Sequence, residues 1–268
     1  MSSAPPRRVA VLGGGHLGAA LARGWAASGL VTAADITITR RHRSKLDSLA
    51  GEGFGVGTDN AAAVSEADVV IVAVQPAQVE GVLRDIAPVL GARPLISVAT
   101  GVSLAALRAP LGPDAVVARA MPNTAVEAGS SMTCLAGDDR SGPALEAAES
   151  LFAGVGRALV IDEDMMTPAT ALCACGIAFF LRTIRAAAQG GTEIGFHSEE
   201  ALLLAAQTAR GAADLILTTR SHPESEIDRV ATPRGCTIAG LNELEHRGFS
   251  SAMIRGILKA SERAGELL

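Results

Sequence analysis

Three glycines near the start of the chain have the spacing of a loop that binds phosphate groups. Gly13, Gly15 and Gly18 form a GxGxxG pattern, which follows a short apolar run and precedes a helical pattern. In such a loop the first glycine permits a tight turn, the second lets the backbone approach a pyrophosphate, and the third lets helix and strand pack closely. His16 and Leu17 begin the predicted helix, whose N–H groups and positive dipole end face the phosphates. The order of strand, loop and helix predicts a dinucleotide site.

The residues that end the second predicted strand indicate which dinucleotide is bound. An NAD enzyme usually has Asp or Glu there, about 20 residues after the loop, to accept a hydrogen bond from the ribose 2′-hydroxyl. Here the strand ends at Thr39, and Arg40, Arg41, His42 and Arg43 follow. A hydroxyl beside guanidinium groups suits a 2′-phosphate, because arginine binds phosphate through two parallel hydrogen bonds. We therefore expect NADPH, with Thr39 and Arg40 at its 2′-phosphate, and some of the arginines in a merely solvated basic loop.

Two later segments contain residue types that could contact a substrate. Asn123 lies in a turn beyond the C-terminal end of a predicted strand, where open α/β sheets bind ligands; the alternative is an ordinary Asx turn. Residues 232–237 form a turn that leads into an amphipathic helix. The N–H groups of Gly235, Cys236 and Thr237 can bind a carboxylate there without a lysine. The Thr237 hydroxyl can also bond a substrate atom or serve as an N-cap, and the two roles are compatible.

Short β-branched runs alternate with helical stretches in the first part of the chain. The predicted strands cover residues 8–12, 36–39, 68–74, 95–98, 116–120, 131–135 and 158–161, and the last two flank a helix at 142–154. Near-continuous Val and Ile strands separated by helices indicate a parallel sheet covered on both faces, and right-handed crossovers make it doubly wound.

After residue 161 the pattern is helical only. Asp162 is expected to cap a helix with an acidic first turn, and further helices are expected to begin at Ser198 and at residues 221–223, with Gly248 separating the last two. The sequence thus predicts an α/β chain in two domains: a Rossmann-like doubly wound parallel sheet at 1–161, which binds NADP, and an all-helical domain at 162–268.

Composition excludes several classes of protein. Hydrophobic residues make up 49% and charged residues 19%, and the net charge of -5 favours neither nucleic acid nor an anionic membrane as a partner. The apolar stretch at 171–181 is about half of the roughly 20 residues that span a bilayer, so we expect a helix buried in a core or between subunits. The four cysteines form no disulfide framework, and the five histidines show no metal-ligand spacing. These features indicate a cytoplasmic protein without a metal.

Several segments resemble pyrroline-5-carboxylate reductases, and together they cover nearly the whole chain. In the first domain these segments are VLGGGHLGAALARGW, ADVVIVAVQPAQ, ISVATGVSLAALR and RAMPNTAV; in the second they are AAQTARGAADLIL and ATPRGCTIAGLNELEHRGF. The resemblance implies NADPH-dependent hydride transfer to the C=N bond of a small cyclic imino acid, giving L-proline from 1-pyrroline-5-carboxylate. It also implies a homodimer of interlocked helical domains, and possible higher assemblies of dimers.

The resemblance also implies roles for particular residues. Asn123 would face the nicotinamide or the substrate, Asn60 would lie by the adenine ribose, and Thr237 would act as the catalytic residue beside the imine. Ala73, Val74 and Pro76 would add cofactor contacts. A cyclic imine protonates readily, so catalysis is mainly the positioning of the nicotinamide against the imine carbon. This suits a chain without tyrosine, with only two lysines and no evident strong acid.

The chain also departs from the family pattern. Gln75 stands for a lysine, Arg185 for a glutamate and Arg234 for a glycine, and residues 173–179, which include Cys175 and Ile177, replace a Ser-Gly-x-Gly-Pro-Ala-Tyr element. These departures leave two alternatives open: a reductase of another cyclic imino acid, or a regulatory protein that binds NADPH without turnover. A β-hydroxyacid dehydrogenase is disfavoured, because its lysine proton donor has no counterpart besides Lys259 near the C-terminus.

Overall fold

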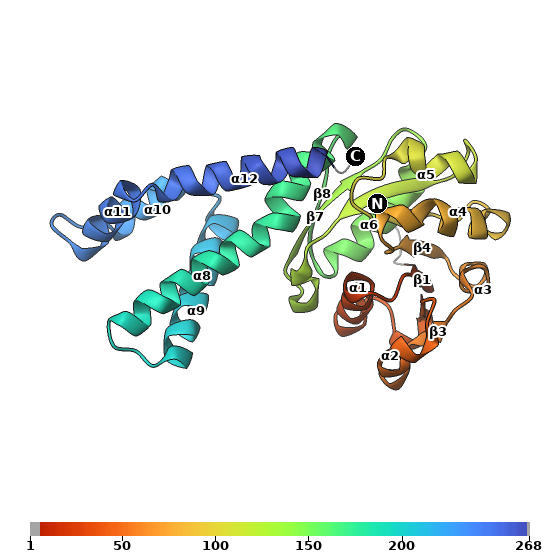
Figure 1. The fold of residues 1–268 in the computed structure, drawn as a ribbon, viewed down its shortest axis with the longest axis horizontal. Helices are drawn as coiled ribbons and strands as arrows, with labels where there is room; N and C mark the ends of the chain where they lie inside the picture. Colours follow the sequence, from red (N-terminus) through yellow and green to blue (C-terminus); the bar gives the residue numbers. More distant parts are fainter. Residues whose placement is uncertain (1–5, 267–268) are drawn as a thin grey trace. The chain divides into compact units, whose positions relative to one another are not determined.

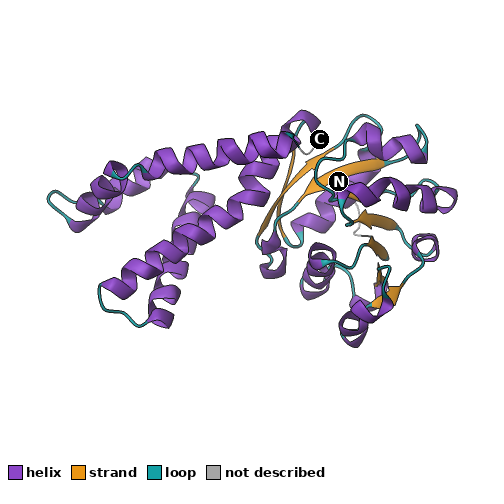
Figure 2. Ribbon diagram, viewed as in Figure 1, coloured by secondary structure: helices purple, strands orange, loops and turns teal. Residues whose placement is uncertain are grey.

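The computed structural model describes residues 6–266, and the chain divides into two compact units (Figure 1). The first unit comprises Met1–Cys175 and Ala260–Leu268, and the second comprises Gly176–Lys259. Strands occur only in the first of these units, and the second is made of helices alone (Figure 2). The first unit thus runs past residue 161, and the functional division expected at that residue stays a prediction.

The first unit is built on one sheet of eight strands. Their order across the sheet is β3 (Gly55–Gly57), β2 (Ile36–Thr39), β1 (Val9–Leu12), β4 (Val69–Val72), β5 (Leu95–Ser97), β6 (Val117–Met121), β7 (Ser131–Ala136) and β8 (Gly156–Val160). The first six strands in this order, from β3 across to β6, all run parallel to one another. Strand β7 is antiparallel to β6, and β8 is parallel to β7. The strand order reverses between β1 and β4, the point at which open sheets of this kind bind ligands.

Helices cover both faces of this sheet. They are α1 (His16–Ala27), α2 (Asp47–Gly51), α3 (Asn60–Ser65), α4 (Pro76–Leu90), α5 (Leu104–Leu111) and α6 (Gly142–Ala153), with short 3-10 turns η1 (Ala33–Asp35), η2 (Arg43–Lys45) and η3 (Thr124–Ala128). The alternation in β1 shows the two faces, because Val9 and Val11 belong to one buried cluster and Ala10 and Leu12 to the other. Burial on both faces explains why these strands are apolar at every position.

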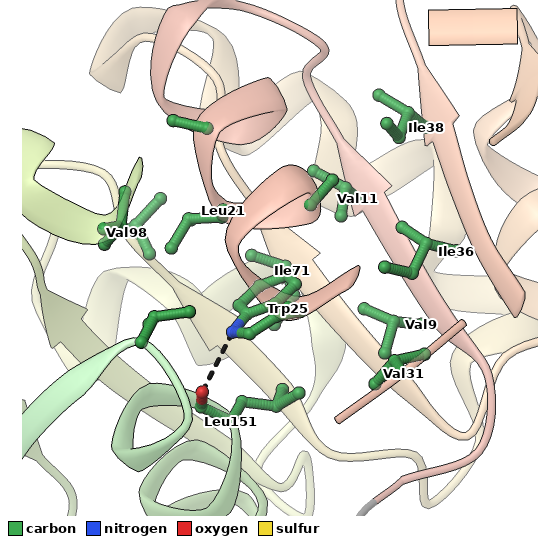
Figure 3. Close-up of a cluster of buried hydrophobic side chains, with 14 of the residues drawn as sticks. Val9, Val11, Leu21, Trp25, Val31, Ile36, Ile38, Ile71, Val98 and Leu151 are labelled. Carbon is green, nitrogen blue, oxygen red and sulfur yellow. Dashed lines mark hydrogen bonds between the residues drawn. The ribbon is translucent and has the colours of Figure 1, made fainter. Parts of the chain in front are cut away.

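Trp25 of α1 fills the centre of the first cluster. Its side chain is fully buried, and its indole N–H donates to the Leu151 carbonyl at 2.9 Å (Figure 3). Its ring also meets that of Phe152 edge to face, with the ring centroids 5.9 Å apart. A buried indole needs such a partner for its N–H. These contacts fasten α1, which carries the glycine loop at its start, to α6.

Arg108 of α5 is a buried charge with a partner. Its guanidinium forms a two-pronged pair with Asp138, with one N–O distance of 2.7 Å, and its side chain is only 8% exposed. The hydrogen bond from Arg108 lowers the pKa of Asp138 to about 2. Breaking such a pair would leave a buried charge without compensation.

The prediction for Asp162 was wrong in one respect. Asp162 does precede a helical turn, η4 (Glu163–Met165), but its side chain makes no capping hydrogen bond. Instead, the Glu163 carboxylate accepts the Leu104 N–H at 2.7 Å and pairs with buried Arg119 at 3.0 Å. The acidic residue therefore serves the N-terminus of another helix, α5, rather than its own.

The chain then passes from short helical turns into long helices. α7 (Met166–Ala169) and a π-helical segment, η5 (Thr170–Cys175), lead to α8 (Gly176–Glu193). The remaining helices are α9 (Ser198–Thr219), α10 (Pro223–Val230), α11 (Cys236–His246) and α12 (Phe249–Gly265). Of these, α9, α10 and α12 begin within one residue of the predicted starts at 198, 221–223 and after Gly248. The residues 163–193 are also long and apolar enough to cross a membrane, judged by length and composition alone.

The second unit has almost no core of its own. Among residues 176–259, all of which the structure describes, only Gly176 and Ala201 are buried. Large apolar side chains are exposed instead, among them Phe180, Leu181, Leu202, Leu203, Leu215, Leu217, Ile254 and Leu258. Burial of apolar surface is the main force that stabilises a folded domain, so helices with this composition need further cover.

Candidate functional site

The glycines of the loop after β1 differ in what requires them. A Cβ atom at Gly13, where φ is 117°, would lie 2.5 Å from the Ala73 carbonyl oxygen, and one at Gly18 would lie 2.2 Å from the Gly13 carbonyl oxygen. A Cβ atom at Gly15 would meet nothing within 4 Å. The protein's own packing therefore requires glycine at 13 and 18. At Gly15 it does not, so the open space there suits close approach of a ligand to the backbone.

The loop ends at the N-terminus of α1. Gly15 is the N-cap and no side chain caps the first turn, which contains His16, Leu17 and Gly18. The Leu17 side chain packs against the core cluster, and His16 is exposed. The backbone N–H groups of this turn, rather than its side chains, are thus the groups available to an anion.

A cavity of about 590 Å³ lies over the loop. Seven of the residues expected to contact the cofactor line it: Gly13, Gly15, Thr39, Arg40, Asn60, Ala73 and Val74. His16, Leu17, Gly18 and Pro76 are not part of the lining, although Pro76 begins α4 directly beside it in sequence. The lining carries three cations, Arg40, Arg41 and Lys45, against one carboxylate, Asp85, so the cavity favours an anionic ligand.

The sequence did not identify Lys45 or Asp85 as lining residues. Lys45 lies in η2 and Asp85 on α4, and neither position is marked by the loop pattern. The helical spacing of Gln78, Gly81, Val82 and Asp85, which share one face of α4, could have indicated Asp85, but no such pattern marks Lys45.

The arginines after β2 have different positions. Arg40 is half-buried, and its Nη1 donates to the Gly14 carbonyl at 3.0 Å, so its guanidinium lies over the glycine loop. Arg41 is exposed and lines the cavity, whereas Arg43 donates to the Val56 carbonyl at 2.8 Å and is not in the lining. The buried Thr39 hydroxyl donates to Asn60 Oδ1 at 2.6 Å, which joins β2 to the start of α3. Arg40 is therefore the arginine that the fold holds nearest the loop.

Asn123 follows β6 and is almost fully buried. Its Oδ1 accepts the Ala125 N–H at 3.0 Å, which is the Asx turn expected as the alternative to a binding role. Its Nδ2 donates to the Cys173 carbonyl at 3.2 Å, and its backbone N–H donates to Ser131 Oγ at 3.2 Å. Asn123 thus joins the end of β6 to the π-helical segment, and it does not line the cavity over the glycine loop.

Cys134 and Cys173 lie side by side beneath this turn. Their Sγ atoms are 3.8 Å apart, with Cys134 buried on β7 and Cys173 half-buried in η5. Hydrogen bonding from Cys134 lowers the pKa of the Cys173 thiol, while the same contact and burial raise the pKa of Cys134. No pattern in the sequence links two cysteines that are 39 residues apart.

The turn before α11 is shaped by its backbone. The Gly235 N–H donates to the Thr232 carbonyl at 2.9 Å, with Pro233 and Arg234 at the two central positions. Arg234 has φ of 58°, in the left-handed region that favours glycine. A Cβ atom at Gly235 would lie 2.4 Å from Thr232 Oγ1. This is the pattern of a type II turn, with proline first and a positive φ second.

The start of α11 presents fewer free donors than the sequence indicated. Because the Gly235 N–H is used inside the turn, the N–H groups of Cys236 and Thr237 remain for a carboxylate. Gly235, not Thr237, is the N-cap, and no side chain caps this helix. The N-cap interpretation of the Thr237 hydroxyl was therefore wrong, and its half-buried side chain is left for another role.

The site also lacks the composition of a metal centre. Within residues 6–266, no group of three His, Cys, Asp or Glu side chains is placed so that it could hold an ion. The expectation that the protein needs no metal stays a prediction.

Comparison with known proteins identifies the family. A family model described as pyrroline-5-carboxylate reductase dimerisation matches residues 163–267, and one described as NADP oxidoreductase, coenzyme F420-dependent, matches residues 8–101. Pyrroline-5-carboxylate reductase 2 of Dictyostelium discoideum is 44% identical over 97% of this chain and 93% of its own length. The chain belongs to the pyrroline-5-carboxylate reductase family.

Other members of the family agree with this assignment. Pyrroline-5-carboxylate reductase 1 of Dictyostelium discoideum is 50% identical over 97% of this chain, although the chain spans only 49% of that longer relative. The Methanosarcina acetivorans reductase is 35% identical and is covered to 98%. The solved reductase of Coxiella burnetii superposes with a TM-score of 0.88 at 28% identity, covering 97% of this chain and 98% of its own. The predicted fold class, a Rossmann-like sheet followed by an all-helical dimerisation domain, is thereby confirmed.

Proposed function

We propose that this protein reduces 1-pyrroline-5-carboxylate to L-proline, using NADPH as the hydride donor. Family membership supports this reaction, and one observation in the structure supports NADPH as its cofactor most directly. The cavity over the glycine loop is lined by the cations that follow β2, at the position where an NAD enzyme would carry a carboxylate.

The residues of this cavity fit NADPH. Gly15 leaves open space against its backbone for a pyrophosphate, and the first turn of α1 offers N–H groups that no side chain caps. The half-buried Arg40, beside Thr39, would hold the 2′-phosphate, and Asn60 would lie at the adenine ribose. NADPH, when bound, supplies the hydride; the chain's part is to bind and orient it. A reductase with NADP bound, from Plasmodium falciparum, shares the fold with a TM-score of 0.87 at 22% identity.

The start of α11 would hold the substrate. We assign the substrate carboxylate to the N–H groups of Cys236 and Thr237, where the helix dipole favours negative charge. The Thr237 hydroxyl would bond the imine nitrogen and keep the ring oriented, and Asn123 would shape the site near the nicotinamide. Because the imine protonates readily in water, orientation provides most of the rate and no tyrosine or lysine is needed.

The exposed apolar helices support a homodimer. Residues 163–267 match the family's dimerisation model, and the large apolar side chains of α8, α9 and α12 need cover that the monomer does not provide. We propose that a second copy covers them, and that the stretch 163–193 lies in this dimer and not in a membrane. Higher assemblies and a cytoplasmic location remain proposals; the latter is supported by the four free cysteines.

NADPH consumption by the full chain tests the reaction. We expect oxidation of NADPH that depends on 1-pyrroline-5-carboxylate, with a higher kcat/KM than for NADH or for a six-membered cyclic imino acid. Faster turnover of the six-membered compound would make the enzyme a reductase of another imino acid. Tight NADPH binding without turnover of either compound would leave a regulatory NADPH-binding protein.

Replacement of one arginine tests the cofactor assignment. Arg40→Ala should weaken NADPH binding about 10- to 100-fold and leave NADH binding nearly unchanged, because hydrogen bonds to a charged group contribute about 1.5–3 kcal/mol. Arg43→Ala is the matched control, since it removes the same charge from a side chain outside the cavity. Calorimetric titration with both cofactors measures the effect. Equal losses in the two variants would contradict the assignment to Arg40.

A further inference from the structure

The contact between Cys134 and Cys173 has no role in the proposed reaction. The two thiols come from a buried strand and from the π-helical segment, and they lie within an apolar cluster with Met121, Ala136 and Met166. We propose that these two cysteines are a site of reversible oxidation, at which a hydroperoxide joins them in a disulfide that slows turnover. The effect on turnover rests on the proposed function, whereas formation of the disulfide does not.

The two thiols differ in the way that such a reaction needs. Cys173 is half-buried and so is the more exposed of the two thiols, and hydrogen bonding from Cys134 lowers its pKa, which favours the thiolate form. Thiolate is the nucleophilic form of cysteine. Cys134 is only 4% exposed and its pKa is raised, so it stays protonated and shielded until its neighbour has reacted. Cys173 is therefore the attacking residue and Cys134 the resolving residue.

The chemistry balances with the hydroperoxide as the only oxidant. The Cys173 sulfur attacks the terminal oxygen of the hydroperoxide; an S–O bond forms, the O–O bond breaks, and the leaving alkoxide takes a proton to become an alcohol. The Cys134 sulfur then attacks the resulting sulfenic acid. An S–S bond forms, the S–O bond breaks, and hydroxide leaves with the Cys134 proton as water. Two thiols are oxidised, and the hydroperoxide is reduced to alcohol and water.

Closure of the bond requires the two sulfur atoms to move towards each other. The Sγ atoms are 3.8 Å apart, and a disulfide requires about 2.05 Å. Cys173 lies in a π-helical turn, a geometry that is rare compared with an α-helix. Its carbonyl accepts the Asn123 Nδ2 hydrogen bond, and Asn123 Oδ1 holds the turn after β6. A shift of Cys173 is thereby passed to Asn123.

This connection predicts which kinetic constant changes. A misplacement of about 1 Å in the reacting geometry can cost about 100-fold in rate, so we expect kcat to fall by about tenfold or more. Neither cysteine lines the cavity over the glycine loop, so NADPH affinity should stay within about twofold. The family pattern has serine at position 173, so this thiol chemistry belongs to chains with cysteine there.

Peptide mapping of the oxidised protein tests the proposal. The dimer of this chain is treated with a small excess of hydrogen peroxide, alkylated under denaturing conditions and digested. We expect one pair of linked peptides, containing Cys134 and Cys173, a lower kcat with unchanged NADPH affinity, and full recovery with dithiothreitol. Linkage is measured without any imine, so its result is independent of the proposed reaction. Oxidation that leaves these two residues unlinked, or that joins Cys175 or Cys236 instead, would overturn the assignment.

Variants separate the disulfide from general oxidative damage. Cys173→Ser replaces the thiol with the hydroxyl of the family pattern, and it should abolish both the linkage and the peroxide response. Cys134→Ala should abolish the linkage and leave Cys173 to overoxidise, so that dithiothreitol no longer restores kcat. Cys175→Ala, which removes a neighbouring thiol, is the control and should keep the linkage. A normal linkage without any change in kcat would refute the effect on turnover.

Discussion

Two alanine substitutions in the glycine loop should have opposite consequences. At Gly15 the backbone angles, φ -78° and ψ -169°, are open to any residue, and an added Cβ meets nothing within 4 Å. The loss of a favourable N-cap and the gain from a less flexible unfolded chain offset each other to within about 0.5 kcal/mol. Gly15→Ala should therefore fold normally. Its methyl group would occupy the space proposed for the pyrophosphate, and NADPH affinity should fall about 10- to 100-fold.

Gly18→Ala should instead damage the fold. Its Cβ would lie 2.2 Å from the Gly13 carbonyl oxygen and 3.2 Å from Val11 Cγ1, so the helix must move away from the loop by more than 1 Å. Overpacking of this kind costs about 1–3 kcal/mol, and more where backbone is involved. Urea unfolding followed by circular dichroism measures stability, and calorimetric titration measures NADPH affinity. Normal NADPH affinity in Gly15→Ala, or normal stability in Gly18→Ala, would refute the division of roles within the loop.

Three further substitutions test other parts of the structure. Thr237→Ala should lower kcat/KM for the imine about 10- to 100-fold, from loss of a hydrogen bond to a charged group, with NADPH affinity unchanged; steady-state kinetics that show equal losses would contradict its role. Asp138→Asn should lower the free energy of unfolding by about 1.5 kcal/mol at neutral pH, because Arg108 loses the negative charge of its partner. Since the folded pKa of Asp138 is about 2, below the ordinary 3.8, its contribution is present above pH 3.8 and is lost as the pH falls towards 2, which urea unfolding at several pH values will show. Arg234→Gly should raise the free energy of unfolding by about 0.5–1 kcal/mol, because glycine adopts the positive φ of this position without strain and adds only a small conformational entropy to the unfolded chain. A lower urea midpoint would show instead that the arginine side chain stabilises the turn.

Most strands could be predicted from the sequence because they are buried on both faces. The predicted strands agree with β1, β2 and β4 to β8 to within two residues at each end. The edge strand β3 was missed, since Gly-Val-Gly offers one apolar residue and no alternation. The reversed direction of β7 could not be predicted either, because an apolar run is the same whether its neighbour runs parallel or antiparallel.

The site could be predicted where chemistry follows local spacing. Gly13, Gly15, Thr39 and Arg40 form a contiguous pattern around one strand end, and the structure places them on one cavity. Roles that depend on long-range contacts could not be predicted. The hydrogen bond of Asn123 to Cys173 and the pairing of the two thiols require the fold, which brings together segments separated by tens of residues.

The position of Trp25 gives the protein a built-in optical probe. The chain has one tryptophan and no tyrosine, so its intrinsic emission arises from one fully buried ring between α1 and α6. That emission reports on the first unit alone, whereas circular dichroism reports on the helices of both units. Superimposable unfolding curves from the two signals would mean one cooperative transition, and separated curves would mean that the sheet and the helices α8 to α11 melt independently. Because reduced nicotinamide absorbs where tryptophan emits, the same ring can also act as an energy donor that registers cofactor binding.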